Sequence, residues 1–109
     1  MRHKINLPQL KRYDITQKVI DALADTESRS ILFSLVRKGK TATELSNSLN
    51  IPLSSVYKKL ADLEYLTLIE IEKYLTSDKG RRFKTYRSRI NKAEIIIKKP
   101  EPIISLSAN

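Results

Sequence analysis

The chain has 109 residues, a length that fits one small domain. It contains no cysteine, a single histidine (His3) and two glycines. These counts leave no disulfide, no thiolate metal site, no phosphate-cradling loop and no Ser/His/Asp set, so we expect no enzyme activity, metal or cofactor. The net charge of +9 favours a polyanionic partner, nucleic acid first and an anionic membrane surface second. A basic protein whose lysines only confer solubility is the plain alternative.

The N-terminal half shows helical periodicity from residue 14 onward. Residues 1–13 lack it and are expected to form an arm, and Asp14 suits the N-cap of a first helix at about 14–24. A second helix is expected at about 26–38, capped by Asp25 and ended by Gly39 in a left-handed cap. The two apolar faces consist of Ile15, Val19, Ile20 and Leu23, and of Ile31, Leu32, Leu35 and Val36.

A helix-turn-helix pattern follows. After a third helix at about 43–49, Asn50 suits the corner because asparagine readily adopts a left-handed conformation. Pro52 suits the first turn of a fourth helix at about 52–65, where its missing N–H costs nothing. One face of that helix carries Val56, Leu60 and Leu63, which we expect in the core.

From Leu68 the pattern changes to the alternation of β-strands. Strands at about 68–76 and 81–90 are expected to form a hairpin with its tip near Asp78–Gly80, because SDKG is a turn sequence. A third strand is expected at about 93–98. The sequence thus predicts a mainly α fold with a small β-hairpin, and this order of elements resembles the winged helix-turn-helix. The resemblance implies an arm (1–13), a DNA-binding domain (14–90) and a C-terminal strand and tail (91–109).

Two segments resemble the ArsR-type regulators. The string ALADTESRSILFSLV, from Ala22 to Val36, is similar to the segment that leads into the motif of that family. The string ELSNSLNIPLSSVYKKLADLEYLTLIE is similar to its helix-turn-helix and the start of its wing, with apolar residues at the usual positions and Ser46 where the two helices cross. The resemblance implies a homodimeric winged-helix protein that binds DNA.

The chain departs from the ArsR pattern at three places. The helix before the recognition helix reads ATELSNSL and lacks the cysteine pair of the metal sensors, so thiolate sensing is excluded. Thr67 stands where a glycine is usual near the start of the wing, and a β-like segment replaces the long terminal dimerisation helix. A dimer is therefore expected to form through residues 14–24 or 93–98.

The resemblance places the fourth helix in the major groove, with its N-terminal half on the base edges. The outward side chains there are Ser54, Ser55, Tyr57 and Lys58, whose hydroxyl and ammonium groups can bond bases or phosphates. Helix capping is the alternative for the two serines. Leu53 either contacts a thymine methyl group or belongs to the core.

The predicted wing is strongly basic. Arginine suits phosphates and narrow minor grooves, so DNA binding explains this composition better than a solvated edge strand does. Phe83 and Tyr86 are expected to pack the hairpin onto the helices. Thr41 and Thr43, at the start of the third helix, either contact phosphate or cap that helix. Between residues 79 and 92 the sequence has no acid and seven cations: Lys79, Arg81, Arg82, Lys84, Arg87, Arg89 and Lys92. The first four of these are the candidates for DNA contact by the wing.

Three functions are compared. The preferred one is a sequence-specific, double-stranded DNA-binding transcription regulator that acts as a homodimer on the nucleoid in the cytoplasm, with no membrane partner. The second is a winged-helix module for protein–protein assembly, which would typically lack a polar recognition face and a cationic wing. The third is a nonspecific chromatin-like DNA-binding protein, whose affinity would depend on salt without sequence preference.

Overall fold

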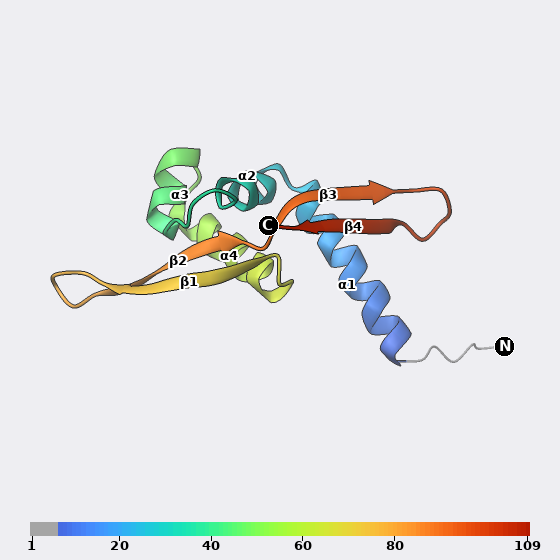
Figure 1. Ribbon diagram of the computed structural model, residues 1–109, viewed down its shortest axis with the longest axis horizontal. Coiled ribbons are helices and arrows are strands. Elements are labelled where there is room, and N and C mark those ends of the chain that lie inside the picture. Colours follow the sequence, from blue (N-terminus) through green and yellow to red (C-terminus); the bar gives the residue numbers. More distant parts are fainter. Residues whose placement is uncertain (1–6) are drawn as a thin grey trace.

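The computed structural model describes the backbone of residues 7–109 and the side chains from residue 15 onward. In this range, residues 69–88 and residues 90–108 form two separate antiparallel hairpins, which extend in opposite directions from the helices (Figure 1). The winged helix-turn-helix predicted from the sequence, mainly α with a β-hairpin, is confirmed. The elements in chain order are α1 (Leu7–Ala24), α2 (Thr26–Ser34), α3 (Ala42–Leu49), α4 (Leu53–Tyr65), β1 (Ile69–Thr76), β2 (Arg82–Ser88), β3 (Ile90–Ile96) and β4 (Ile103–Ala108).

Helix α1 begins at Leu7, well before the expected start, so the N-cap predicted at Asp14 is wrong and residues 7–13 are helical. A proline in the first turn is compatible with a helix, and the sequence between Pro8 and Asp14 contains no helix breaker. The rest of the predicted arm, residues 1–6, lies outside the described residues. Val19 and Leu23 are buried as expected, whereas Ile15 is 50% exposed and does not belong to the core.

Helix α2 ends at Ser34 rather than at residue 38, and Gly39 does not form a left-handed cap. The N-cap predicted at Asp25 is confirmed, because its carboxylate accepts a hydrogen bond from the Ser28 amide at 3.0 Å. Strand β2 satisfies the carbonyls that follow α2: the Ser88 amide donates to the Leu35 carbonyl, and the Arg87 guanidinium donates to the Val36 carbonyl. The chain therefore leaves the helix to pair with the wing.

The helix-turn-helix has the predicted corner. Asn50 has a φ of 56° in the left-handed region, and the Ser46 hydroxyl donates to the Ile51 carbonyl at 2.6 Å, which ties α3 to the turn. Pro52 is the N-cap residue of α4 rather than a member of its first turn. The side chains of Val56, Leu60 and Leu63 are buried as predicted, so α4 turns its opposite face outward.

The first hairpin contains a β-bulge at its base. Ile71 pairs with Tyr86 and Lys73 pairs with Thr85, which leaves Glu72 without a cross-strand partner. The Glu72 carboxylate accepts from Arg87 at 3.0 Å and lies so close to Gly39 that a side chain at residue 39 would collide with it. The second hairpin includes the predicted third strand, but β3 begins earlier, at Ile90, and the tail that follows forms its partner β4.

Candidate nucleic-acid interface

The N-terminal half of α4 presents an exposed polar surface. Ser54 and Lys58 are exposed, Tyr57 is 52% exposed and Ser55 is half-buried. No side chain caps α4, so neither serine performs the capping role that was the alternative to DNA contact. Leu53 is 40% exposed, which places it on this surface rather than in the core. The structure thus brings these predicted residues together around the first turns of one helix.

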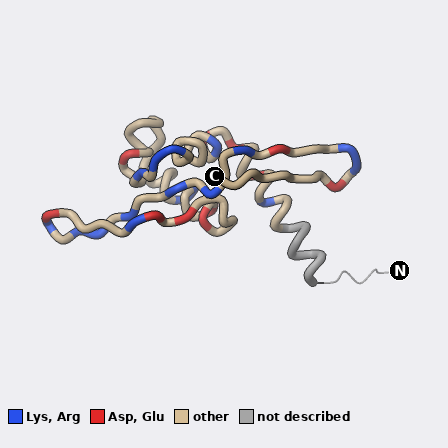
Figure 2. The backbone as a smooth tube through the Cα atoms, in the orientation of Figure 1, with Lys and Arg blue, Asp and Glu red and all other residues tan. Residues whose placement is uncertain are grey.

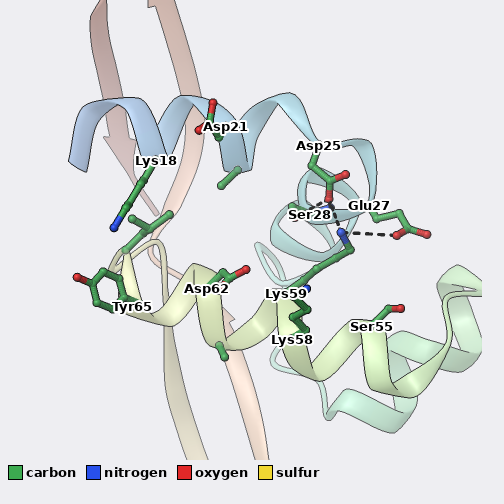
Figure 3. Close-up of a pocket in the computed structure, with 13 residues that line it drawn as sticks. Lys18, Asp21, Asp25, Glu27, Ser28, Ser55, Lys58, Lys59, Asp62 and Tyr65 are labelled. Carbon is green, nitrogen blue, oxygen red and sulfur yellow. Dashed lines mark hydrogen bonds and ion pairs between the residues drawn. The ribbon is translucent and has the colours of Figure 1, made fainter. Parts of the chain in front are cut away.

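Two of these residues also border a cleft beside α1. The cleft has a volume of about 930 Å³, and its lining includes Ser55 and Lys58 together with Lys18, Asp62 and Tyr65 (Figure 3). Tyr57 is absent from this lining, so it lies elsewhere on the outer surface of α4. The outward surface of the helix is therefore divided between an open side and a side that faces α1.

An ion pair fixes α4 against the start of α2. The Lys59 ammonium lies 2.7 Å from the Asp25 carboxylate and 3.7 Å from that of Glu27 (Figure 3). The hydrogen bond from Lys59, assisted by those from Ser28, lowers the pKa of Asp25 to about 2, and the hydrogen bond to Asp25 raises the pKa of Lys59. Both groups are thus charged at neutral pH, and the pair restrains the rotation and position of α4.

The tip of the first hairpin is a tight turn. The Gly80 amide donates to the Ser77 carbonyl at 2.9 Å, and the Arg81 amide donates to the Ser77 hydroxyl at 3.1 Å. Gly80 has a φ of 78°, a conformation that side chains rarely adopt. The turn lies where the sequence predicted it, and it places Lys79 and Arg81 at the extreme end of the wing.

The basic residues of the wing fall into two groups (Figure 2). Near its base, Arg87 pairs with Glu72 at 3.0 Å and Arg89 approaches Glu70 at 3.9 Å. Further along the chain, Lys92 and Glu94 pair at 3.3 Å. In the part of the chain that the structure describes, the four wing candidates have no acidic partner, and all four are exposed: Lys79, Arg81, Arg82 and Lys84. These four charges are available for a polyanion.

The start of α3 is less suited to phosphate. Thr41 caps this helix: its hydroxyl accepts from the Glu44 amide at 3.1 Å, and the Glu44 carboxylate accepts from the Thr41 amide at 2.9 Å. The second hydrogen bond lowers the pKa of Glu44, so a negative charge stands at this helix terminus. Capping thus accounts for Thr41, whereas Thr43 is exposed and takes no part in the cap.

Several exposed residues near the wing were not singled out from the sequence. Lys73 and Tyr74 belong to the exposed surface of β1, and the Lys84 ammonium lies 6.0 Å from the centre of the Tyr74 ring. The alternation of side chains along β1 indicated which of them are exposed. The bulge at Glu72, however, changes which side chains lie on the same face of the hairpin. Tyr86 is buried as expected, whereas Phe83 is 38% exposed and pairs across the hairpin with Leu75, not with the helices.

Neither a cluster of metal ligands nor a membrane-spanning helix is found among the described residues. Among residues that the structure describes, no three histidine, cysteine, aspartate or glutamate side chains gather as metal ligands would. None of the described helices is both long and apolar enough to cross a membrane.

Comparison with known proteins agrees with this fold. No curated protein matches the chain. The crystal structure of NolR from Sinorhizobium fredii resembles it with a TM-score of 0.58 and 18% sequence identity, over 80% of this chain and 81% of that one. The family described as the TFIIE alpha subunit matches residues 14–104, which include α2 to β3 entire and most of α1. The chain has a winged-helix fold of the DNA-binding type and belongs to the TFIIE alpha subunit family.

Proposed function

We propose that the chain is a sequence-specific, double-stranded DNA-binding transcription regulator. It acts as a homodimer on the nucleoid in the cytoplasm, in the manner of ArsR-type regulators but without thiolate metal sensing, and it has no catalytic role. The fold and the family support a DNA-binding role in transcription. The sequence preference, the ArsR-like mode of action and the dimer are our proposals.

The proposal assigns different tasks to the two parts of the interface. Helix α4 enters the major groove, where Tyr57 and Lys58 contact base edges and the serines of the first turn contact bases or phosphates. The wing follows the adjacent sugar–phosphate backbone of the DNA. Its arginines bind phosphates or a narrow minor groove, because the planar guanidinium donates several hydrogen bonds to phosphate oxygens.

The observation that carries this proposal is the separation of charges on the wing. The two acids of β1, Glu70 and Glu72, lie near the base and engage Arg89 and Arg87, and one further acid, Asp78, stands in the turn at the tip. The outer half of the hairpin keeps four cations without an acidic partner among the described residues. Lysines that served solubility alone would have no reason to be arranged in this way. Cations without an acidic partner are the groups that neutralise the phosphates of the DNA backbone.

A second candidate function rests on the opposite end of the molecule. The β3–β4 hairpin exposes Ile97 and Ile103, at 74% and 62%, which is unusual for a DNA-binding surface and typical of a protein contact. A module used only for protein assembly would have this feature, but it would not need the unpaired cations of the wing. We therefore rank assembly second and a nonspecific DNA coater third.

Selection from a pool of random duplexes with the full chain tests the proposal. We expect an enriched sequence motif, and an affinity for that motif that falls steeply as salt is raised. A salt-dependent affinity without any enriched motif would favour the nonspecific coater. No binding at low salt would refute the DNA-binding proposal and leave the assembly module.

A further inference from the structure

The β3–β4 hairpin has one face that is entirely apolar. Residues opposite each other in an antiparallel pair lie on the same face. The register pairs Ala93 with Leu106 and Ile95 with Ile104, so these four side chains share a face. The other face begins with two polar pairs and ends with an apolar one: Lys92 with Ser107, Glu94 with Ser105, and Ile96 with Ile103.

The helices cover only part of the apolar face. Ala93 and Ile104 pack against the hydrophobic core, which anchors the hairpin to the domain. Ile95 and Leu106 remain 40% and 41% exposed. The apolar face thus continues beyond the area that the domain itself covers, on an element that projects away from the wing (Figure 1).

The outer edge of β4 lacks the features that protect sheet edges. Among the described residues no strand pairs with this edge. Natural edge strands usually carry a lysine, a proline or a bulge that prevents pairing with another chain. Strand β4 reads IISLSA, with no charge and no proline, and the register shift of this hairpin lies in β3, between Ile90 and Lys92. The edge is therefore competent to accept a further strand.

We propose that β4 pairs antiparallel with β4 of a second copy of the chain, about a two-fold axis at Ser105. This inference rests on the homodimer of the proposed function and names its interface. In this register Ser105 lies opposite the second copy's Ser105, and Ile104 lies opposite the second copy's Leu106 on the apolar face, while Ile103 meets the second copy's Ser107 on the other face. A slip of one strand by one residue against the other would bring the apolar face of one copy onto the polar face of the second copy. A two-fold interface requires such self-complementarity.

Strand β4 is a surface at which a second copy meets little charge repulsion. Two chains that each carry a net charge of +9 repel one another over most of their surfaces. Strand β4 carries no charge, and on β3 the charge of Lys92 is neutralised by its ion pair with Glu94. The paired strands form a sheet in the order β3–β4–β4–β3, in which the two apolar faces become continuous and both wings remain at the outside.

Site-directed cross-linking tests the register, since the chain contains no cysteine of its own. In full-length Ser105→Cys the two thiols face each other across the axis, and mild oxidation should convert most of the protein to a covalent dimer. Ser107→Cys is the matched control, because its two thiols would be offset by four residues, roughly 14 Å along the strand, which is beyond the reach of a disulfide. Equal cross-linking of both variants would overturn the register.

Sedimentation without DNA tests the interface itself. Leu106→Lys should raise the dissociation constant of the dimer at least about 100-fold, because it would bury an ammonium group in the apolar face. Ile97→Lys, which adds the same charge at the turn beyond β3, should not change it. Circular dichroism checks that the variants fold. If Leu106→Lys does not fold, the comparison of cross-linking between Ser105→Cys and Ser107→Cys tests the interface by itself. A dimer that survives Leu106→Lys would place the interface elsewhere. A monomeric wild-type chain that binds DNA would refute the homodimer but leave DNA binding intact.

Discussion

The wing can be tested by removing two of its unpaired cations. In Arg81→Ala/Arg82→Ala the substituted side chains are exposed and have no ion pair within the described part of the chain, so the fold should be unaffected. Four such cations per chain give about eight per dimer, and contact of all eight with phosphates predicts a slope of log affinity against log salt of about −7. The variant keeps about four contacts and should show a slope of about −4.

These slopes translate into a large difference in affinity. Between 50 and 200 mM salt, the wild-type chain should lose about 10⁴-fold in affinity and the variant about 10²-fold, as measured by fluorescence anisotropy of a labelled duplex. Both a preferred duplex and a scrambled one should show the change, because phosphate contacts are independent of sequence.

A matched control separates wing contacts from a general effect of net charge. Lys98→Ala/Lys99→Ala removes the same two charges from the turn of the opposite hairpin, where both lysines are exposed. Its slope should stay close to that of the wild-type chain. If both double variants flatten the slope equally, the wing does not lie on the DNA backbone and the assignment of these arginines is wrong.

Three further changes test other parts of the structure. Lys58→Ala should weaken binding to the preferred duplex by about 1–3 kcal/mol with little loss on scrambled DNA, and equal losses would mean that Lys58 holds phosphate only. Asp25→Asn should lower the unfolding free energy at pH 7. The depressed pKa of about 2 against 3.8 corresponds to at most about 2.4 kcal/mol, which solvent screening of a side chain 42% exposed reduces to about 1 kcal/mol. Because this pKa is lowered on folding, the contribution is complete above pH 3.8 and is lost as pH falls toward 2, so pH-dependent melting curves of the two proteins should converge in acid. Thr67→Gly should raise the unfolding free energy by about 0.5 kcal/mol, since Thr67 has a φ of 61° that a β-branched residue tolerates poorly, whereas Thr67→Ala should bring no such gain.

Features set by a few neighbouring residues could be predicted from the sequence. Asn50 at the corner, Asp25 as an N-cap and the turn at Gly80 each depend on local backbone preferences, and each is found where the residue type indicated. The buried face of α4 also follows from local periodicity, because Val56 and Leu60 lie one helical turn apart.

Features set by distant residues could not be predicted in this way. Helix α2 ends early because Arg87 and Ser88, more than fifty residues later, bond the carbonyls that follow it. The division of the wing into paired and unpaired cations depends on Arg87 meeting Glu72, which the bulge brings about. The sequence shows a run of cations, but the identity of the free ones is decided by cross-strand register.

The two hairpins differ in the property that decides what each can bind. Both are antiparallel pairs that project from the same helical body in opposite directions (Figure 1). The wing places unpaired cations on its outer half, so its attraction to a polyanion weakens as salt screens charge. Strand β4 is uncharged, so salt should leave its pairing unchanged or strengthen it by screening the repulsion between two basic chains. A rise in salt would thus release the DNA while preserving the dimer, which makes the two activities separable in one titration.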